Sequence, residues 1–248
     1  MRKLLAVGVV ALGTFGLIAI RGTKTAVAAP QGTARELAPL QLIQKIPVPG
    51  VAGRIDHFTA FPKRRLLIFA ALGNNSMEIV NTFQAKVVQS VKGLDEPQGV
   101  LYVPGLDKIF VANAGNGTVK VYDGKTYALR KSIALGEEAD TDNLRWDEDS
   151  KRVFVGIVGG IAMIDAVTEA HVGKDLKGSG GHSESFQLEK KGSRVFVNVP
   201  DDGSVVNVID RKTGESTKWG STESKQTIPW RSMKTITGSS WSLGDRRS

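Results

Sequence analysis

Nine polar residues near the starts of four short apolar segments could carry chemistry in this sequence. The segments begin "GRIDHFTAF", "EPQGVLYV", "TDNLRWDE" and "HSESFQLE". The nine candidates are Arg54, Asp56, His57, Glu96, Gln98, Asp142, Asn143, His182 and Glu184. If the four segments lie side by side, these side chains face a common space in which a ligand or an ion could bind.

One chemistry that these residues could perform is the binding of a divalent cation such as calcium. Asp56, Gln98, Asn143 and Glu184 supply one side-chain oxygen from each segment, and oxygen is the ligand that Ca²⁺ prefers. His57 and His182 could instead bind a transition metal. The third interpretation is that these polar side chains only line a water-filled channel, and all three interpretations stay open at this point.

The elements that position these residues follow from a repeat of about 42 residues. Phenylalanines recur at spacings of 41, 44 and 42 residues, at Phe69, Phe110, Phe154 and Phe196. A polar residue after each of them recurs at spacings of 42, 42 and 45 residues, at Asn81, Asp123, Asp165 and Asp210. Two sets with one period indicate a repeat architecture. We expect the recurring polar side chains to hydrogen-bond the backbone of turns.

Each repeat predicts four short β-strands. In the second repeat, "QGVLYV", "KIFVAN", "TVKVYD" and "LRKSIAL" are separated by segments that contain Gly, Asn or Asp. Val, Ile, Phe and Tyr dominate these segments, and no apolar period of 3.6 residues predicts a helix. The Asn-Gly pair of "AGNG" is typical of the positive φ angles in a tight hairpin turn. Units of this length with four strands predict an all-β fold, the β-propeller, with blades around a central channel.

The stretch "IFVANAGNGTVKVYDGKTYALRKSIALG" closely resembles the YVTN-type repeat of bacterial β-propellers, the group that includes YncE-like proteins. The resemblance covers Val51 to Gly220 and implies about four four-stranded blades, at residues 53–94, 95–136, 137–180 and 181–220. In the preceding segment, residues 29–52, we expect Leu37–Pro49 to supply an outer strand that closes the ring. The resemblance implies a propeller of usually seven blades, and seven repeats of this length need about 300 residues, so a seven-bladed parent is expected.

Residues 1–28 predict a signal peptide. Arg2 and Lys3 precede an apolar stretch from Leu4 to Ile20, and Ala26-Val27-Ala28 provides a cleavage site. Cleavage after Ala28 predicts a periplasmic or secreted protein. The apolar stretch has 17 residues, near the lower limit for a membrane-spanning helix, so an uncleaved anchor is the alternative.

The charge distribution argues against nucleic acid as a partner. The net charge is +8, of which residues 1–29 contribute +4 and residues 221–248 contribute +3. The repeats therefore lie in a nearly neutral segment, unlike a domain that binds phosphate backbones. The sequence has no Cys, which excludes disulfides and thiolate metal sites. We expect no membrane contact beyond the signal segment.

Residues 221–248 do not continue the repeat, and they end in "TIPWRSMKTITGSSWSLGDRRS". One permitted set of codons for this ending, read one register over, encodes "NYPMALDEDNHRLFVVARRPP", which resembles the blade start "ESFQLEKKGSRVFV". We therefore interpret residues 221–248 as a non-native tail that follows a frameshift, with a genuine disordered tail as the alternative. Because such a truncation would expose strand edges, we expect the isolated chain to be poorly soluble.

The function predicted from these observations is binding without catalysis. An exported propeller would bind a partner protein or a small-molecule ligand through its loops or channel, and we expect the intact parent to be a monomer. A fainter resemblance to regucalcin- and gluconolactonase-like propellers implies the alternative, a divalent-metal-dependent lactonase-type hydrolase whose channel carboxylates hold the ion. A non-functional truncated product is the third possibility.

Overall fold

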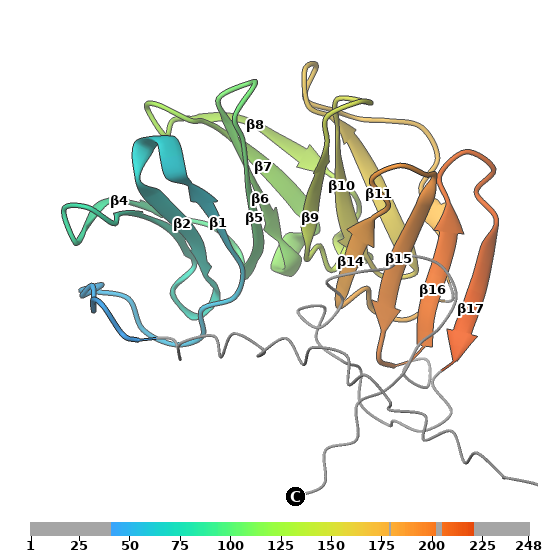
Figure 1. Ribbon diagram of the computed structural model, residues 1–248, viewed down its shortest axis with the longest axis horizontal. Helices are drawn as coiled ribbons and strands as arrows, with labels where there is room; N and C mark the ends of the chain where they lie inside the picture. Colours follow the sequence, from blue (N-terminus) through green and yellow to red (C-terminus); the bar gives the residue numbers. More distant parts are fainter. Residues whose placement is uncertain (1–40, 179, 202–204, 221–248) are drawn as a thin grey trace, which may run out of the picture. The chain divides into compact units, whose positions relative to one another are not determined.

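The computed structural model describes residues 41–178, 180–201 and 205–220, and these residues form four antiparallel sheets in chain order (Figure 1). The first sheet contains β1 (Phe58–Phe61), β2 (Leu66–Ala71), β3 (Ser76–Asn81) and β4 (Lys86–Lys92). The second sheet contains β5 (Pro97–Val103), β6 (Lys108–Asn113), β7 (Thr118–Asp123) and β8 (Leu129–Ala134). The third sheet contains β9 (Leu144–Asp147), β10 (Arg152–Ile157), β11 (Gly160–Asp165), β12 (Ala170–His171) and β13 (Leu176–Lys177). The fourth sheet contains β14 (Ser185–Leu188), β15 (Arg194–Val199), β16 (Val205–Asp210) and β17 (Ser216–Gly220).

Short 3₁₀ turns are the other regular elements of the described residues: η1 (Pro62–Arg64), η2 (Leu72–Asn74), η3 (Ala114–Asn116) and η4 (Glu137–Ala139). The four sheets belong to one compact unit that begins at Gln44. The prediction of an all-β fold with about four four-stranded repeats is confirmed. No helix among the described residues is long and apolar enough to cross a membrane.

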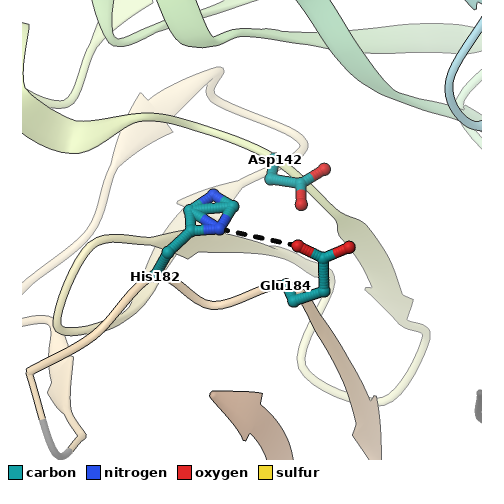
Figure 2. Close-up of side chains that lie close together, drawn as sticks. All are labelled: Asp142, His182 and Glu184. Carbon is teal, nitrogen blue, oxygen red and sulfur yellow. Dashed lines mark ion pairs between the residues drawn. The ribbon is translucent and has the colours of Figure 1, made fainter. Parts of the chain in front are cut away.

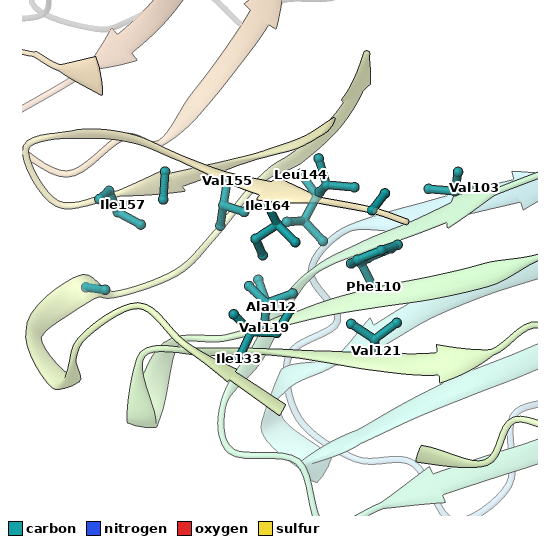
Figure 3. Close-up of a cluster of buried hydrophobic side chains, with 14 residues drawn as sticks. Val103, Phe110, Ala112, Val119, Val121, Ile133, Leu144, Val155, Ile157 and Ile164 are labelled. Atoms are coloured by element: carbon teal, nitrogen blue, oxygen red, sulfur yellow. The ribbon is translucent and has the colours of Figure 1, made fainter. Parts of the chain in front are cut away.

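Apolar side chains pack each sheet against the next one. Between the second and third sheets, Phe110, Val119 and Val121 meet Val155 and Ile164, and all five side chains are buried (Figure 3). Ile68 and Ile109 belong to the corresponding cluster between the first and second sheets, and Phe154 and Phe186 to the one between the third and fourth. The core therefore lies between the sheets, and it holds each first strand beside the next.

Strand β6 shows why the predicted strands are continuous apolar runs. Side chains alternate between the two faces of a strand. Ile109 and Val111 face the first sheet, whereas Phe110 and Ala112 face the third. Because both faces of this sheet are covered, both sets of positions must be apolar. The outer strand β8, by contrast, is mostly exposed.

The first phenylalanine of the recurring set lies one position away from its expected place. Leu66 pairs with Asn81 as Lys108 pairs with Asp123, so Ile68 is the structural equivalent of Phe110. Ile68 packs against the second sheet, and Phe69 packs on the opposite face with Ala71 and Val80. A shift of one residue reverses the face that a side chain occupies. The interval of 42 residues between Ile68 and Phe110 is therefore the structural repeat.

The outer strand of the third sheet is interrupted. Both β12 and β13 pair with β11, through His171 opposite Ile164 and Leu176 opposite Ile161. Four residues, 172–175, therefore lie opposite two residues of β11 and must loop out. Gly173 has a φ of +70° within this loop, and His171 Nε2 lies 2.8 Å from Asp175 Oδ1 across it.

The recurring polar residues hold turns, as predicted. The carboxylate of Asp123 accepts hydrogen bonds from the backbone N–H groups of Lys125 and Thr126, at 3.0 and 2.8 Å. The same pattern occurs at Asn81, Asp165 and Asp210. Backbone hydrogen bonds lower the pKa of the Asp123 carboxyl below its usual value. These side chains stabilise the turn after the third strand of each sheet.

The described residues before the first sheet do not form the expected strand. Residues 41–49 contain no strand, and Ile46 and Val48 pack against the first sheet beside Phe69. The expected ring-closing strand is therefore not formed in the described part of Leu37–Pro49. The predicted signal peptide, residues 1–28, and the predicted non-native tail, residues 221–248, lie outside the described residues.

Candidate functional site

The predicted polar residues lie at the starts of the first strands β1, β5, β9 and β14. Each of these strands contacts the first strand of the next sheet, β1 with β5, β5 with β9, and β9 with β14. The polar segments before them, residues 54–57, 95–98, 140–143 and 182–184, are therefore carried at corresponding ends of neighbouring sheets. This arrangement brings together side chains that are far apart in sequence.

Three carboxylates occupy equivalent positions in this arrangement. The backbone N–H groups of Asp56, Asp142 and Glu184 each donate to a carbonyl of the adjacent second strand, at 3.0, 3.0 and 3.1 Å. The register therefore makes Asp142, rather than Asn143, the equivalent of Asp56 and Glu184. In the second sheet the pairing of β5 with β6 is irregular between Pro97 and Val100, the interval that contains Gln98.

His57 connects the first sheet with the third. Its Nε2 atom lies 3.0 Å from Asp142 Oδ1 and 2.9 Å from Asn143 Nδ2. The Asn143 amide is held on both sides, because Nδ2 donates to Glu184 O at 2.6 Å and Oδ1 accepts from Arg145 Nη1 at 3.2 Å. Asp142 and Asn143 are buried, whereas the His57 side chain is 37% exposed. This group links residues of the first, third and fourth sheets.

Two members of the site were missed from the sequence. Arg145 donates to Asn143 and, through Nε, to Gln187 Oε1 at 3.1 Å. Side chains alternate between the faces of β9, so positions 143 and 145 share a face, and this alternation could have identified Arg145 from the sequence. Asp140 accepts from Gln98 Nε2 at 3.4 Å, and its Oδ2 lies 3.4 Å from His182 Nε2. The acidic loop "EEADTD" was the available signal for Asp140.

The other predicted residues lie at the edge of this group. Arg54 donates to Asp56 Oδ2 at 2.7 Å, and Asp56 Oδ1 lies 3.5 Å from His57 Nε2. Glu96 has a φ of +46°, and its backbone N–H donates to Asn75 Oδ1 at 3.0 Å. The Glu96 side chain is exposed, so its described role is in the backbone.

Burial and neighbouring charges shift the pKa of three groups in the site. Burial by itself would lower the pKa of His57, but the hydrogen bond and charge of Asp142, together with the charge of Asp56, outweigh it and raise the pKa. Burial raises the pKa of Asp56, and the charge of Asp142 adds to this effect. Burial lowers the pKa of Arg145. The site therefore favours a cationic His57 beside the Asp142 carboxylate.

A second group of side chains could hold a metal ion. Asp142, His182 and Glu184 each offer one ligand atom, and these atoms all lie within 4.8 Å of one another. Figure 2 shows the three side chains directed toward one another, and His182 Nδ1 lies 3.9 Å from Glu184 Oε2. Of the predicted oxygen quartet, Asp56, Gln98, Asn143 and Glu184, only Glu184 belongs to this group.

Repeated four-stranded antiparallel sheets, packed face to face with their first strands adjacent, define a β-propeller. Two solved β-propeller structures are similar to this chain. Hydrazine synthase from Kuenenia stuttgartiensis is 21% identical with a TM-score of 0.59, over 72% of this chain and 52% of that one. The dihydro-heme d1 dehydrogenase NirN, in complex with DHE, is 19% identical with a TM-score of 0.54, over 66% of this chain and 37% of that one.

These similarities show the fold alone. This chain spans about half of the first neighbour and about a third of the second, by the coverages of 52% and 37%. No family model matches the sequence. No curated protein sequence matches it either.

Proposed function

We propose that this protein is an exported β-propeller of the YVTN-repeat kind that binds a small polar ligand at the starts of its first strands, without catalysis of its own. The observation that carries this proposal is the contact of His57 with Asp142, which joins polar side chains of different blades. Hydrogen-bonding groups that converge from separate blades are typical of ligand sites in a propeller channel.

The charges of the site suggest which ligand it would bind. The site contains four carboxylates, Asp56, Asp140, Asp142 and Glu184, and two guanidinium groups, Arg54 and Arg145. Arg54 is already paired with Asp56. A ligand with an amine or several hydroxyl groups would complement the remaining acceptors, and we therefore infer a cationic or polyhydroxylated small molecule.

Export is proposed from the sequence features of residues 1–28. The basic pair Arg2-Lys3, the apolar stretch and the Ala26-Val27-Ala28 site together support cleavage by a signal peptidase. Mass spectrometry of the periplasmic and secreted fractions should find a mature chain that begins at Ala29. Recovery of the uncleaved chain in the membrane fraction would contradict this part of the proposal.

A thermal-shift screen tests the binding function. The purified chain is screened against a panel of amines, amino sugars and polyols at millimolar concentration, and hits are measured by calorimetry. We expect a hit whose affinity falls at least tenfold in His57→Ala and is unchanged in His171→Ala, the exposed histidine of the third sheet. The absence of any hit, or equal affinity in His57→Ala, would count against the proposal.

A further inference from the structure

Asp142, His182 and Glu184 bring metal-binding groups from two neighbouring blades to one point. Asp142 precedes β9 in the third sheet, and His182 and Glu184 precede β14 in the fourth. Their ligand atoms lie within 4.8 Å of one another, and the side chains converge in Figure 2. This group differs from the quartet of oxygen donors that the sequence predicts. It contains an imidazole and two carboxylates, and it has no amide side chain.

The spacing of His182 and Glu184 fits an intervening ion better than a direct hydrogen bond. His182 Nδ1 lies 3.9 Å from Glu184 Oε2, beyond hydrogen-bond distance. Two ligand atoms that each lie about 2.1 Å from a bound ion are roughly 3–4 Å apart. The 3.9 Å separation is within that range, and Glu184 can adjust because its side chain is 58% exposed.

The other nitrogen of His182 is a second observation that points to a ligand. Nε2 is buried and has no hydrogen-bond partner among the described residues. It faces Asp140, whose Oδ2 atom lies 3.4 Å away without hydrogen-bond geometry. A metal-bound histidine usually directs its second N–H to a carboxylate, which fixes the ring orientation. Binding of an ion at Nδ1 would place the proton on Nε2, where Asp140 is the available acceptor.

Asp142 is already oriented for such a role. Its Oδ1 faces His57 Nε2 at 3.0 Å, and its Oδ2 accepts from Asn143 Nδ2 at 3.2 Å. Each carboxylate oxygen has two lone pairs, so one hydrogen bond to each oxygen leaves capacity for a metal ion. Arg145 donates to Asn143, Leu144 and Gln187. Asp142 shares its negative charge with His57, so the Glu184 carboxylate supplies the additional negative charge that a cation would meet.

We propose that Asp142, His182 and Glu184 bind a divalent transition-metal ion such as Zn²⁺ or Mn²⁺. Zn²⁺ accepts imidazole and carboxylate ligands and Mn²⁺ prefers carboxylates, whereas Ca²⁺ prefers a larger set of oxygen ligands. Three protein ligands leave at least one position for water or for an exogenous group. The ion site goes beyond the binding function proposed above, because it does not require an organic ligand.

Calorimetric titration of the metal-free full chain with ZnCl₂ and MnCl₂ tests the site. We expect one equivalent to bind and the melting temperature to rise. His182→Ala and Glu184→Gln should each weaken binding at least tenfold, and Glu184→Gln should fold normally because that side chain is 58% exposed. His171→Ala is the matched control, because that histidine also has a carboxylate neighbour, Asp175, and should bind as the unchanged chain does.

Cobalt substitution gives a readout that does not depend on stability. Co²⁺ bound to one nitrogen and carboxylate oxygens should give visible absorption bands that His182→Ala removes and His171→Ala retains. Equal binding by His182→Ala, loss of binding in His171→Ala, or no binding by the unchanged chain would each overturn the proposal. Binding of Ca²⁺ in preference to both transition ions would overturn it as well, in favour of the oxygen quartet.

Discussion

The Nε2 atom of His57 lies 3.0 Å from Oδ1 of Asp142, although 85 residues separate them in the sequence. His57 precedes the first strand of the first blade, and Asp142 precedes the first strand of the third. The blade between them contributes Gln98, whose carbonyl accepts from the His57 backbone N–H at 3.3 Å. This contact can span the second blade because the first strands of the three blades lie next to one another, β1 beside β5 and β5 beside β9.

Replacement of His57 by alanine should lower the free energy of unfolding by about 1–2 kcal/mol, because buried Asp142 loses a hydrogen-bond donor. The expected loss is modest because the histidine side chain is 37% exposed and water can partly replace it. Urea unfolding of His57→Ala, Asp142→Ala and the double variant would isolate the contact. Strictly additive effects of the two single changes would show that the contact contributes nothing to stability.

A buried ion cluster between the second and third blades should make stability depend on pH. Glu169 Oε1 lies 2.7 Å from Lys108 Nζ and 2.8 Å from Arg130 Nε. Burial by itself would raise the pKa of Glu169, but the hydrogen bonds and charges of Lys108 and Arg130 outweigh it and lower the pKa. Because the folded pKa is below the unfolded value of 4.5, the contribution is present above pH 4.5 and lost as the pH falls through the folded pKa.

Glu169→Gln should therefore lower the free energy of unfolding by about 3 kcal/mol at pH 7, because Lys108 becomes a buried charge without its carboxylate. The difference from the unchanged chain should shrink toward zero as the pH falls below 4.5 and through the lowered pKa of Glu169. Chemical unfolding between pH 3 and pH 8 measures this convergence. Arg130→Gln is the control, with an expected loss of about 0.5 kcal/mol, since Arg130 is 43% exposed. A constant difference across this pH range would refute the assignment.

The fold could be predicted because repetition multiplies a weak local signal. The single run "KIFVAN" fits any buried strand, but four such runs at one period identify a sheet architecture. The register within one repeat could not be predicted from residue type. Ile68 and Phe69 are both large and apolar, and only the pairing of Leu66 with Asn81 shows which of them faces the second blade. The loop that interrupts the outer strand of the third sheet could not be predicted either, because it also depends on which residues pair with β11.

From the sequence, the site could be predicted only as a set of polar residues near the starts of the first strands. Asp142 and Asn143 are adjacent in sequence, and either could have been the equivalent of Asp56. The backbone hydrogen bond of Asp142 to the second strand decides between them. Alternation along β9 and the acidic loop could have marked Arg145 and Asp140 as candidates, but their partners lie in other segments, Gln187 for the arginine and His182 for the aspartate. Sequence spacing does not contain these contacts.

Gly117, in the hairpin of the second blade, should not tolerate a side chain. It has a φ of +57°, and a Cβ atom there would lie 1.6 Å from the carbonyl oxygen of Gly136. The sequence predicted positive φ at an Asn-Gly pair, and of the two residues the glycine adopts it. Gly117→Ala should lower the free energy of unfolding by at least about 2 kcal/mol, because both the backbone conformation and the backbone contact are unfavourable.

Gly105→Ala is the matched control for this prediction. Gly105 also lies in a turn of the second blade, but its φ is not positive and a Cβ atom there would meet nothing within 4 Å. We therefore expect its free energy of unfolding to change by less than about 0.5 kcal/mol. Guanidinium unfolding of both variants, followed by Trp fluorescence, makes the comparison. If Gly117→Ala were as stable as Gly105→Ala, the hairpin would have to approach Gly136 less closely than the structure places it.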